Sequence, residues 1–211
     1  MTFNATIALF DDYYRLADAG NVAEFNRDLG CEVRERLLQL DYIVDRVRKL
    51  EGIAKQATAR HEAAFQAHRD DINARGIAYE SVPLPENVKF TKEEMDAHSK
   101  AAFELKLFSE AFYYFAGRVR TILKKTGLPG LQGFECKGVR DVRNKLLEHA
   151  GEKQSVVVIQ SFGWGAPQGP VLKAARYGGQ EDVFPDAGLY RNAEEFIDNL
   201  DRSLRAAMSG L

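Results

Sequence analysis

The chain has 211 residues, of which 45% are hydrophobic and 28% are charged, and its formal net charge is −2. These values are typical of one globular domain and exclude a low-complexity or strongly polyionic chain. Two cysteines, Cys31 and Cys136, are too few for a disulfide framework, which predicts a cytoplasmic protein in a reducing compartment. No apolar run approaches 18 residues, so we expect no membrane span.

The first half of the chain predicts two helices. Residues 2–18 form the first, and Gly20 interrupts it. Residues 22–75 are rich in strong helix formers, and apolar side chains recur three and four residues apart, which predicts one buried face. The members of that face are Leu37, Leu40, Val44, Val47 and Ala54. Gly30 and Gly52 weaken the case for one unbroken helix.

A loop over 76–90 and a long helix over 91–125 are expected next. Thr91 and Glu94 have the spacing of a capping box, in which each side chain bonds the other residue's backbone N–H. Six apolar positions then alternate three and four apart: Leu105, Phe108, Phe112, Phe115, Val119 and Ile122. This spacing is typical of a helix-bundle core, and a ligand-binding aromatic box is the alternative.

The last third of the chain mixes helix and strand patterns. The expected elements are a helix over 138–150, a strand over 156–159, a turn over 163–170, a return strand over 171–177 and a helix over 192–208 capped by Asn192. The sequence therefore predicts a single, mostly α domain over 1–211. It is a helical bundle with a small β-hairpin insertion at about 155–178.

Residues 143–149 read Arg-Asn-Lys-Leu-Leu-Glu-His. An arginine, a polar residue directly after it and a histidine a few residues on resemble the motif of the HEPN superfamily of all-α proteins. The resemblance implies a ribonuclease with Arg143, Asn144 and His149 as catalytic residues. It also implies a homodimer in which two motifs form one site that uses no metal and no cofactor. The resemblance covers about 91–150, and the hairpin departs from the family's pattern.

The motif's residue types suit RNA cleavage by attack of the 2′-hydroxyl. Such cleavage needs a base and an acid, and histidine titrates near neutrality, so His149 can serve as either. Arg143 offers a planar, permanently charged fork for the phosphate, and Asn144 can orient one of these groups. Six residues of α-helix turn the chain by about 600°, which leaves Arg143 and His149 about 120° apart. Two copies can solve this mismatch because each contributes a different face.

The charge around the motif predicts an anionic partner such as RNA. From Gly117 to Leu146 the chain has two acidic residues and eight basic ones, a net charge of +6. The basic residues besides Arg143 are Arg118, Arg120, Lys124, Lys125, Lys137, Arg140 and Lys145. A basic patch is the electrostatic footprint of nucleic-acid binding. A solvated basic helix end is the alternative interpretation.

Three functions remain open on the sequence alone. The first is a metal-independent endoribonuclease, acting as a toxin with an antitoxin partner or as a phage-defence effector. The second is a non-catalytic HEPN-like module that binds RNA or a protein. The third is a structural helical protein. The motif favours the first over the second, and the basic segment favours both over the third.

Overall fold

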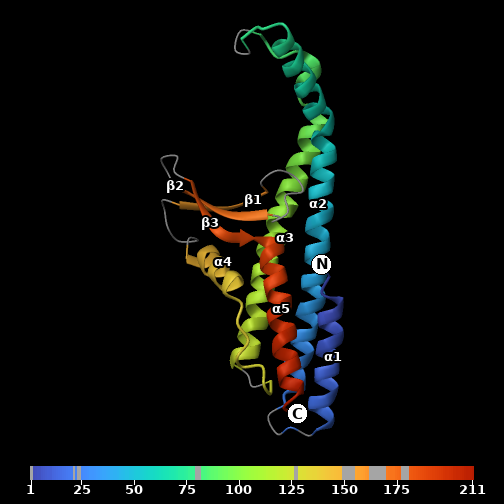
Figure 1. Cartoon of the computed structure of the whole chain (residues 1–211), viewed down its shortest axis with the longest axis vertical. Helices are drawn as coiled ribbons and strands as arrows, with labels where there is room; N and C mark the ends of the chain where they lie inside the picture. Colours follow the sequence, from blue (N-terminus) through green and yellow to red (C-terminus); the bar gives the residue numbers. More distant parts are fainter. Residues whose placement is uncertain are drawn as a thin grey trace.

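The computed structural model describes residues 2–20, 22, 25–78, 82–125, 128–148, 155–161, 170–176 and 181–211. For residues 125, 145, 147–148, 155–161, 171–176 and 181–187 it describes the backbone alone. The molecule is an elongated, mostly helical bundle with a small sheet and a short helix on one side (Figure 1). No helix in the described part is both long and apolar enough to cross a membrane.

Helices α1 (Asn4–Ala19) and α2 (Arg27–Ala74) match the two helices expected in the first half of the chain. The Asn26 side chain begins α2 by accepting a hydrogen bond from the Leu29 N–H at 3.1 Å. α2 is a single helix of 48 residues, so Gly30 and Gly52, which weakened the case for one unbroken helix, do not interrupt it. The tertiary packing of its apolar face outweighs the helix-weakening tendency of two isolated glycines.

The long helix α3 (Lys92–Lys125) follows a loop that contains the short 3-10 helix η2 (Glu86–Val88). The capping box is confirmed: the Thr91 N–H donates to Glu94 Oε2 at 2.8 Å, and the Glu94 N–H donates to Thr91 Oγ1 at 3.2 Å. The bundle-core interpretation is also confirmed. Four of the six expected positions are buried and the other two, Phe108 and Phe115, are half-buried at the edge of the core.

After α4 (Lys137–Glu148) come three strands and the last helix. β1 (Ser155–Ser161), β2 (Pro170–Arg176) and β3 (Glu181–Gly188) form an antiparallel sheet in the order β1-β2-β3. This differs from the expected two-stranded hairpin by a third strand. The sequence pattern did not indicate β3, because it contains Pro185. Proline occurs in sheets only in edge strands, at strand starts and at bulges, so it argues against a strand.

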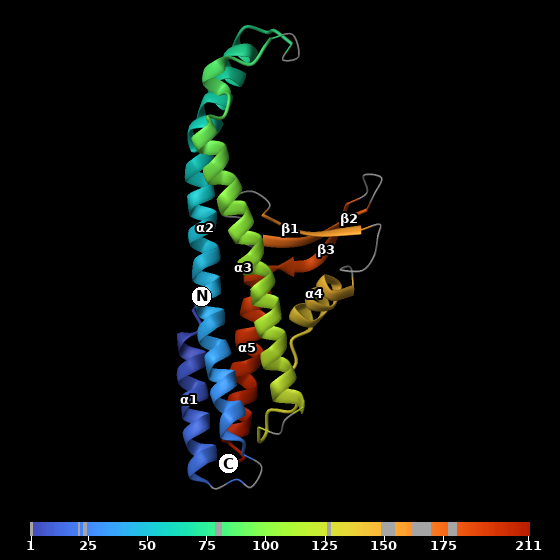
Figure 2. The same cartoon turned by 180° about the vertical axis from the view of Figure 1, so that it is seen from behind.

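Helix α5 (Leu189–Met208) begins directly after β3 and not at Asn192, so the expected cap is wrong. Asn192 is buried instead, and its side-chain amide donates to the Tyr113 hydroxyl at 2.9 Å. α1, α2, α3 and α5 form the base of the molecule, and α2 and α3 continue beyond it as a two-helix arm (Figures 1 and 2). The sheet and α4 lie on one side of α3 and α5, and this is where the motif is placed.

Candidate functional site

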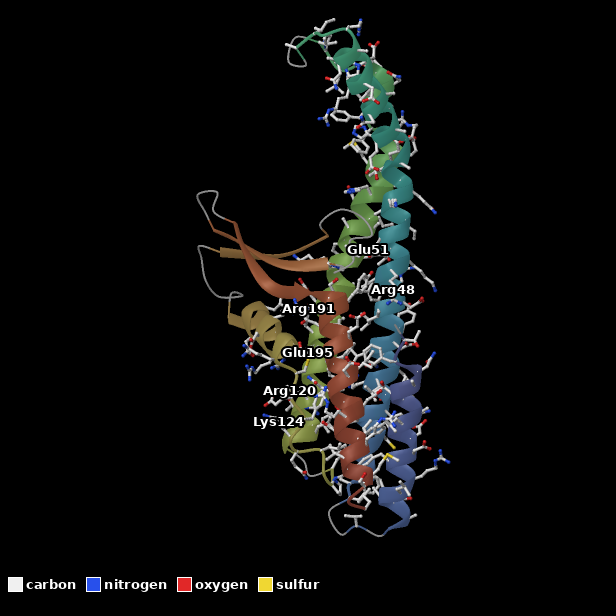
Figure 3. The ribbon with its side chains drawn as sticks, in the orientation of Figure 1. Arg48, Glu51, Arg120, Lys124, Arg191 and Glu195 are labelled. Atoms are coloured by element: carbon white, nitrogen blue, oxygen red, sulfur yellow. The ribbon has the colours of Figure 1, made fainter. Side chains whose placement is uncertain are left out.

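The N-terminus of α4 is fixed against α5. The Lys137 N–H donates to Glu195 Oε1 at 3.1 Å, so a carboxylate of α5 caps α4. Gly138 permits this close approach, since a Cβ at that position would overlap the side-chain oxygen of Asn192. α4 is therefore held at its first turn, and the motif lies in its second half (Figure 3 labels Glu195).

Arg143 lies across α3. Its aliphatic stem occupies the space that a side chain at Gly117 would fill, because a Cβ there would overlap Arg143 Cδ. The side chain is half-buried, and it forms no ion pair with any side chain that the structure describes. Asn144 is exposed beside it. An arginine that is held by its stem and lacks a described carboxylate partner can bind an external anion.

The third motif residue, His149, lies outside the described residues. α4 ends at Glu148, directly before it. The angular relation between Arg143 and His149 therefore stays a prediction. Trp164, in the segment expected as a turn, also lies outside the described residues.

The structure pairs several of the basic residues with carboxylates. Arg118 donates to both oxygens of Glu32 on α2, at 2.9 and 3.3 Å, and Arg120 donates to both oxygens of Glu135, at 2.8 and 3.2 Å. Lys124 also contacts Glu135. Bonds from Arg120 and then Lys124 lower the pKa of Glu135 to about 2, so it is ionised at neutral pH.

The remaining basic residues differ in their surroundings. Arg140 donates to Asp141 at 3.0 Å. Lys137 is exposed, and its ammonium has no ion pair with a described side chain. The side chains of Lys125 and Lys145 lie outside the described residues. In the folded protein the local charge of +6 is partly neutralised, because Glu32, from a distant part of the chain, pairs with Arg118.

Sequence reasoning missed a polar cluster between α2 and α5. Glu51 is only 4% exposed, and the Tyr190 hydroxyl donates to its Oε2 at 2.5 Å. The Arg48 guanidinium lies 5.3 Å from the centre of the Tyr190 ring (Figure 3 labels Arg48 and Glu51). Burial, and then the bond to Glu51, raise the pKa of Tyr190.

The sequence did contain a sign of this cluster. Glu51 follows Val44 and Val47 at the same three- and four-residue spacing, so it occupies a core position of the α2 face. A carboxylate at such a position requires partners, because burying it without them is costly. The cluster attaches the first turn of α5 to α2. No group of three potential metal ligands occurs among the residues that the structure describes.

These placements put Arg143, the arginine of the basic segment without a described carboxylate partner, next to the exposed amide of Asn144. Such a pair can bind and orient a phosphate group. Comparisons of the chain with protein-family models, with curated proteins and with solved structures found no match.

Proposed function

We propose that the protein is a metal-independent endoribonuclease of the HEPN type, acting as a toxin or phage-defence effector. The observation that supports this most directly is that Arg143 has no carboxylate partner among the described residues. Among the described arginines of the basic segment, Arg118, Arg120 and Arg140 donate to carboxylates, whereas Arg143 has no described carboxylate partner. The motif arginine is therefore the one available for a phosphate.

The proposed reaction is an attack of a ribose 2′-hydroxyl on the adjacent phosphate, which leaves a 2′,3′-cyclic phosphate and a free 5′-hydroxyl. His149 takes the proton from the 2′-hydroxyl or donates one to the leaving 5′-oxygen. Arg143 binds the phosphate oxygens as negative charge develops on them. Asn144 positions one of these groups. Two copies of the motif in a homodimer supply both an acid and a base.

RNA binding in this proposal depends mainly on the cations without a described partner. For Arg118, Arg120 or Arg140 to bind RNA, a phosphate has to compete with a carboxylate that the guanidinium already contacts. Arg143 and Lys137 have no such competition from a described side chain. We therefore expect substitution of Arg143 to weaken RNA binding more than substitution of Arg118.

The partial neutralisation of the basic segment favours a second candidate, a non-catalytic HEPN-like module that binds RNA or a protein partner such as an antitoxin. In that case Arg143 and Asn144 recognise the partner and no bond is cleaved. The two candidates differ in one product, the 2′,3′-cyclic phosphate end.

The test is incubation of total RNA with purified protein, with and without EDTA, followed by analysis of the RNA ends. His149→Ala is expected to reduce cleavage by about 10²–10⁴-fold, the usual loss for an acid–base group. His98→Ala, on the arm, is the matched control and should retain full activity. Arg143→Lys should also lose cleavage, because lysine keeps the positive charge but lacks the planar guanidinium that binds two phosphate oxygens. Arg140→Lys is its control.

EDTA should leave the rate unchanged. Combining His149→Ala with Arg143→Lys should cost much less than the sum of the two separate free energies, because the residues act as one unit. Equal cleavage by the wild type and His149→Ala would contradict the proposed ribonuclease activity. Retained RNA binding without cleavage would then leave the binding module as the function.

A further inference from the structure

We infer that Gly117 is a positioning residue for Arg143. Because Gly117 has no side chain, it leaves a space on α3, here called the Gly117 slot, and the arginine stem lies in it. Gly117 is buried in the interior of α3, where glycine lowers helix stability relative to alanine. The slot offsets that loss by setting where the guanidinium meets an anion. That this anion is an RNA phosphate rests on the proposed function, whereas the slot itself does not.

The Gly117 slot holds the part of Arg143 that directs its guanidinium. A Cβ at position 117 would overlap Arg143 Cδ and would lie 2.8 Å from Nε and 3.7 Å from Cγ. No residue with a side chain therefore allows this path for the arginine. A free arginine side chain loses much rotamer freedom when it is ordered. An arginine already held at Cδ and Nε loses less of this freedom when it binds a phosphate.

Two anchors on different helices give the side chain its direction. Val139 and Val142 are 0% and 5% exposed, so α4 is packed against the bundle, and this fixes the backbone of Arg143. Gly117 fixes the stem where it meets α3, which lies beside α4 (Figures 1 and 2). The position of the guanidinium depends on both anchors, and only the second can be changed without altering α4.

The slot holds Arg143 by packing and leaves its N–H donors available. The Gly117 carbonyl oxygen accepts a hydrogen bond from Thr121 Oγ1 at 2.9 Å. Arg143 itself has no carboxylate partner among the described residues. A guanidinium that is placed through its stem keeps its donors for the two oxygens of a phosphate.

Alanine at position 117 should displace the arginine and leave the helices in place. The atoms that a Cβ would overlap belong to a half-buried, flexible side chain and not to the backbone. Gly138 is the contrasting case, because a Cβ there would overlap the side chain of Asn192, which is buried and bonded to Tyr113. Gly138→Ala should therefore disturb the fold, whereas Gly117→Ala should change the position of Arg143 alone.

The first test needs no RNA and measures the mobility of the Arg143 Nε–H group by ¹⁵N NMR relaxation. The signal is assigned by its loss in Arg143→Lys. Its order parameter should be high in the wild type and should fall in Gly117→Ala. Gly52→Ala is the matched control and should leave it unchanged, since Gly52 also lies within a long helix and a Cβ there meets nothing within 4 Å. A mobile Nε–H in the wild type, or no change in Gly117→Ala, would overturn the inference.

The second test asks by urea unfolding whether the arginine is the group that gives way. In an Arg143→Ala background the Gly117 slot is empty, so Gly117→Ala should raise the urea midpoint, because alanine favours the helix. With Arg143 present the increase should be smaller, because the displaced stem loses its packing. Equal increases in the two backgrounds, or a Gly117→Ala protein that does not fold, would overturn the inference.

The third test measures RNA cleavage and binding. Gly117→Ala keeps every cation and misplaces one, and a misplacement of about 1 Å can lower a rate by about 10²-fold. We expect kcat to fall by about that factor while KM stays the same. The salt dependence of binding to an uncleavable 2′-deoxy oligonucleotide should also stay the same, because the number of cations is unchanged. In an Arg143→Lys background, Gly117→Ala should cause no further loss.

These outcomes separate the Gly117 slot from the proposed function. An Arg143 that is ordered in the wild type and released in Gly117→Ala, in a protein that cleaves no RNA, keeps the slot and contradicts the ribonuclease. Equal cleavage by the wild type and Gly117→Ala keeps the ribonuclease and overturns the role of Gly117. A loss of cleavage that is as large in the Arg143→Lys background as in the wild type would also overturn it, because Gly117 would then not act through the arginine.

Discussion

The base and the arm of the molecule are built from the same two long helices but are stabilised differently. In the base, α1 and α5 cover α2 and α3, and aromatic rings meet around Phe196, which lies 6.1 Å from Phe3 and 5.3 Å from Phe134 between ring centres. The Tyr13 hydroxyl donates to the Pro129 carbonyl at 3.1 Å and ties the loop after α3 to α1. Apolar burial therefore dominates the free energy of the base.

In the arm, α2 and α3 pack against each other and against the loop that contains η2, and neither α1 nor α5 covers them. Among the described residues from 59 to 100, only Ile72 and Val88 are buried. Polar contacts therefore contribute more here than in the base. Arg60 makes several of them, because it donates to Glu94 and to the carbonyls of Asn87 and Lys89. A helix pair with so little buried area can open locally while the base stays folded. Helix length alone therefore does not give stability.

Removing the ring at the centre of the base should have the largest effect. Phe196→Ala is expected to lower the free energy of unfolding by about 3–5 kcal/mol, because it removes apolar contacts and leaves a cavity. Leu16→Ala, on the exposed side of α1, should change it by less than about 0.5 kcal/mol. Urea unfolding measures both. A loss below about 1 kcal/mol for Phe196→Ala would show that the base does not depend on this cluster.

The sequence predicted the parts of the fold that depend on local chemistry. The capping box at Thr91 and Glu94 needs two side chains and two backbone groups within four residues, and it is present. The inner row of α3 depends on helical periodicity alone. Asn192 shows the limit of this reasoning, because capping and buried hydrogen bonding use the same residue type. Only the position of Tyr113, 79 residues away, decides between them.

The candidate site was less predictable because it depends on contacts between distant residues. Glu32 neutralises Arg118 across 86 residues, so the charge counted within one segment exceeds the charge of the surface. The packing of Arg143 on Gly117 likewise joins α4 to α3 and has no local sign. The motif itself was visible as a pattern, and its geometry at His149 stays a prediction.

A glycine near the junction of base and arm gives a smaller expected effect, with the opposite sign. Gly52→Ala should raise the free energy of unfolding by about 0.5–1 kcal/mol, because alanine restricts the unfolded chain and a Cβ there meets nothing within 4 Å. Gly30→Ala is the control in the base, and it should destabilise because its Cβ would overlap the Tyr14 ring. If both substitutions stabilised the protein, packing in the base would not be tight.

The smallest effect on global stability is expected from the polar contact that holds the arm. Arg60 donates to both oxygens of Glu94, at 2.6 and 2.7 Å, and this bond, with that from the Thr91 N–H, lowers the pKa of Glu94 to about 2. The ordinary value is 4.5. Because the pKa is lower in the folded state, the contribution is fully present above about pH 4.5 and is lost as the pH falls to about 2.

Arg60→Met should therefore return the pKa of Glu94 toward its ordinary value, as NMR titration of the carboxyl group would measure. Arg75→Met, which removes an arm ion pair with Asp71, should leave Glu94 unchanged. The effect of Arg60→Met on urea unfolding should be small at neutral pH, since exposed ion pairs contribute little, and it should vanish near pH 2. A difference from wild type that is as large at pH 2 as at pH 7 would mean that Arg60 acts through its two carbonyl contacts. The arm would then be held by backbone capping and not by the ion pair.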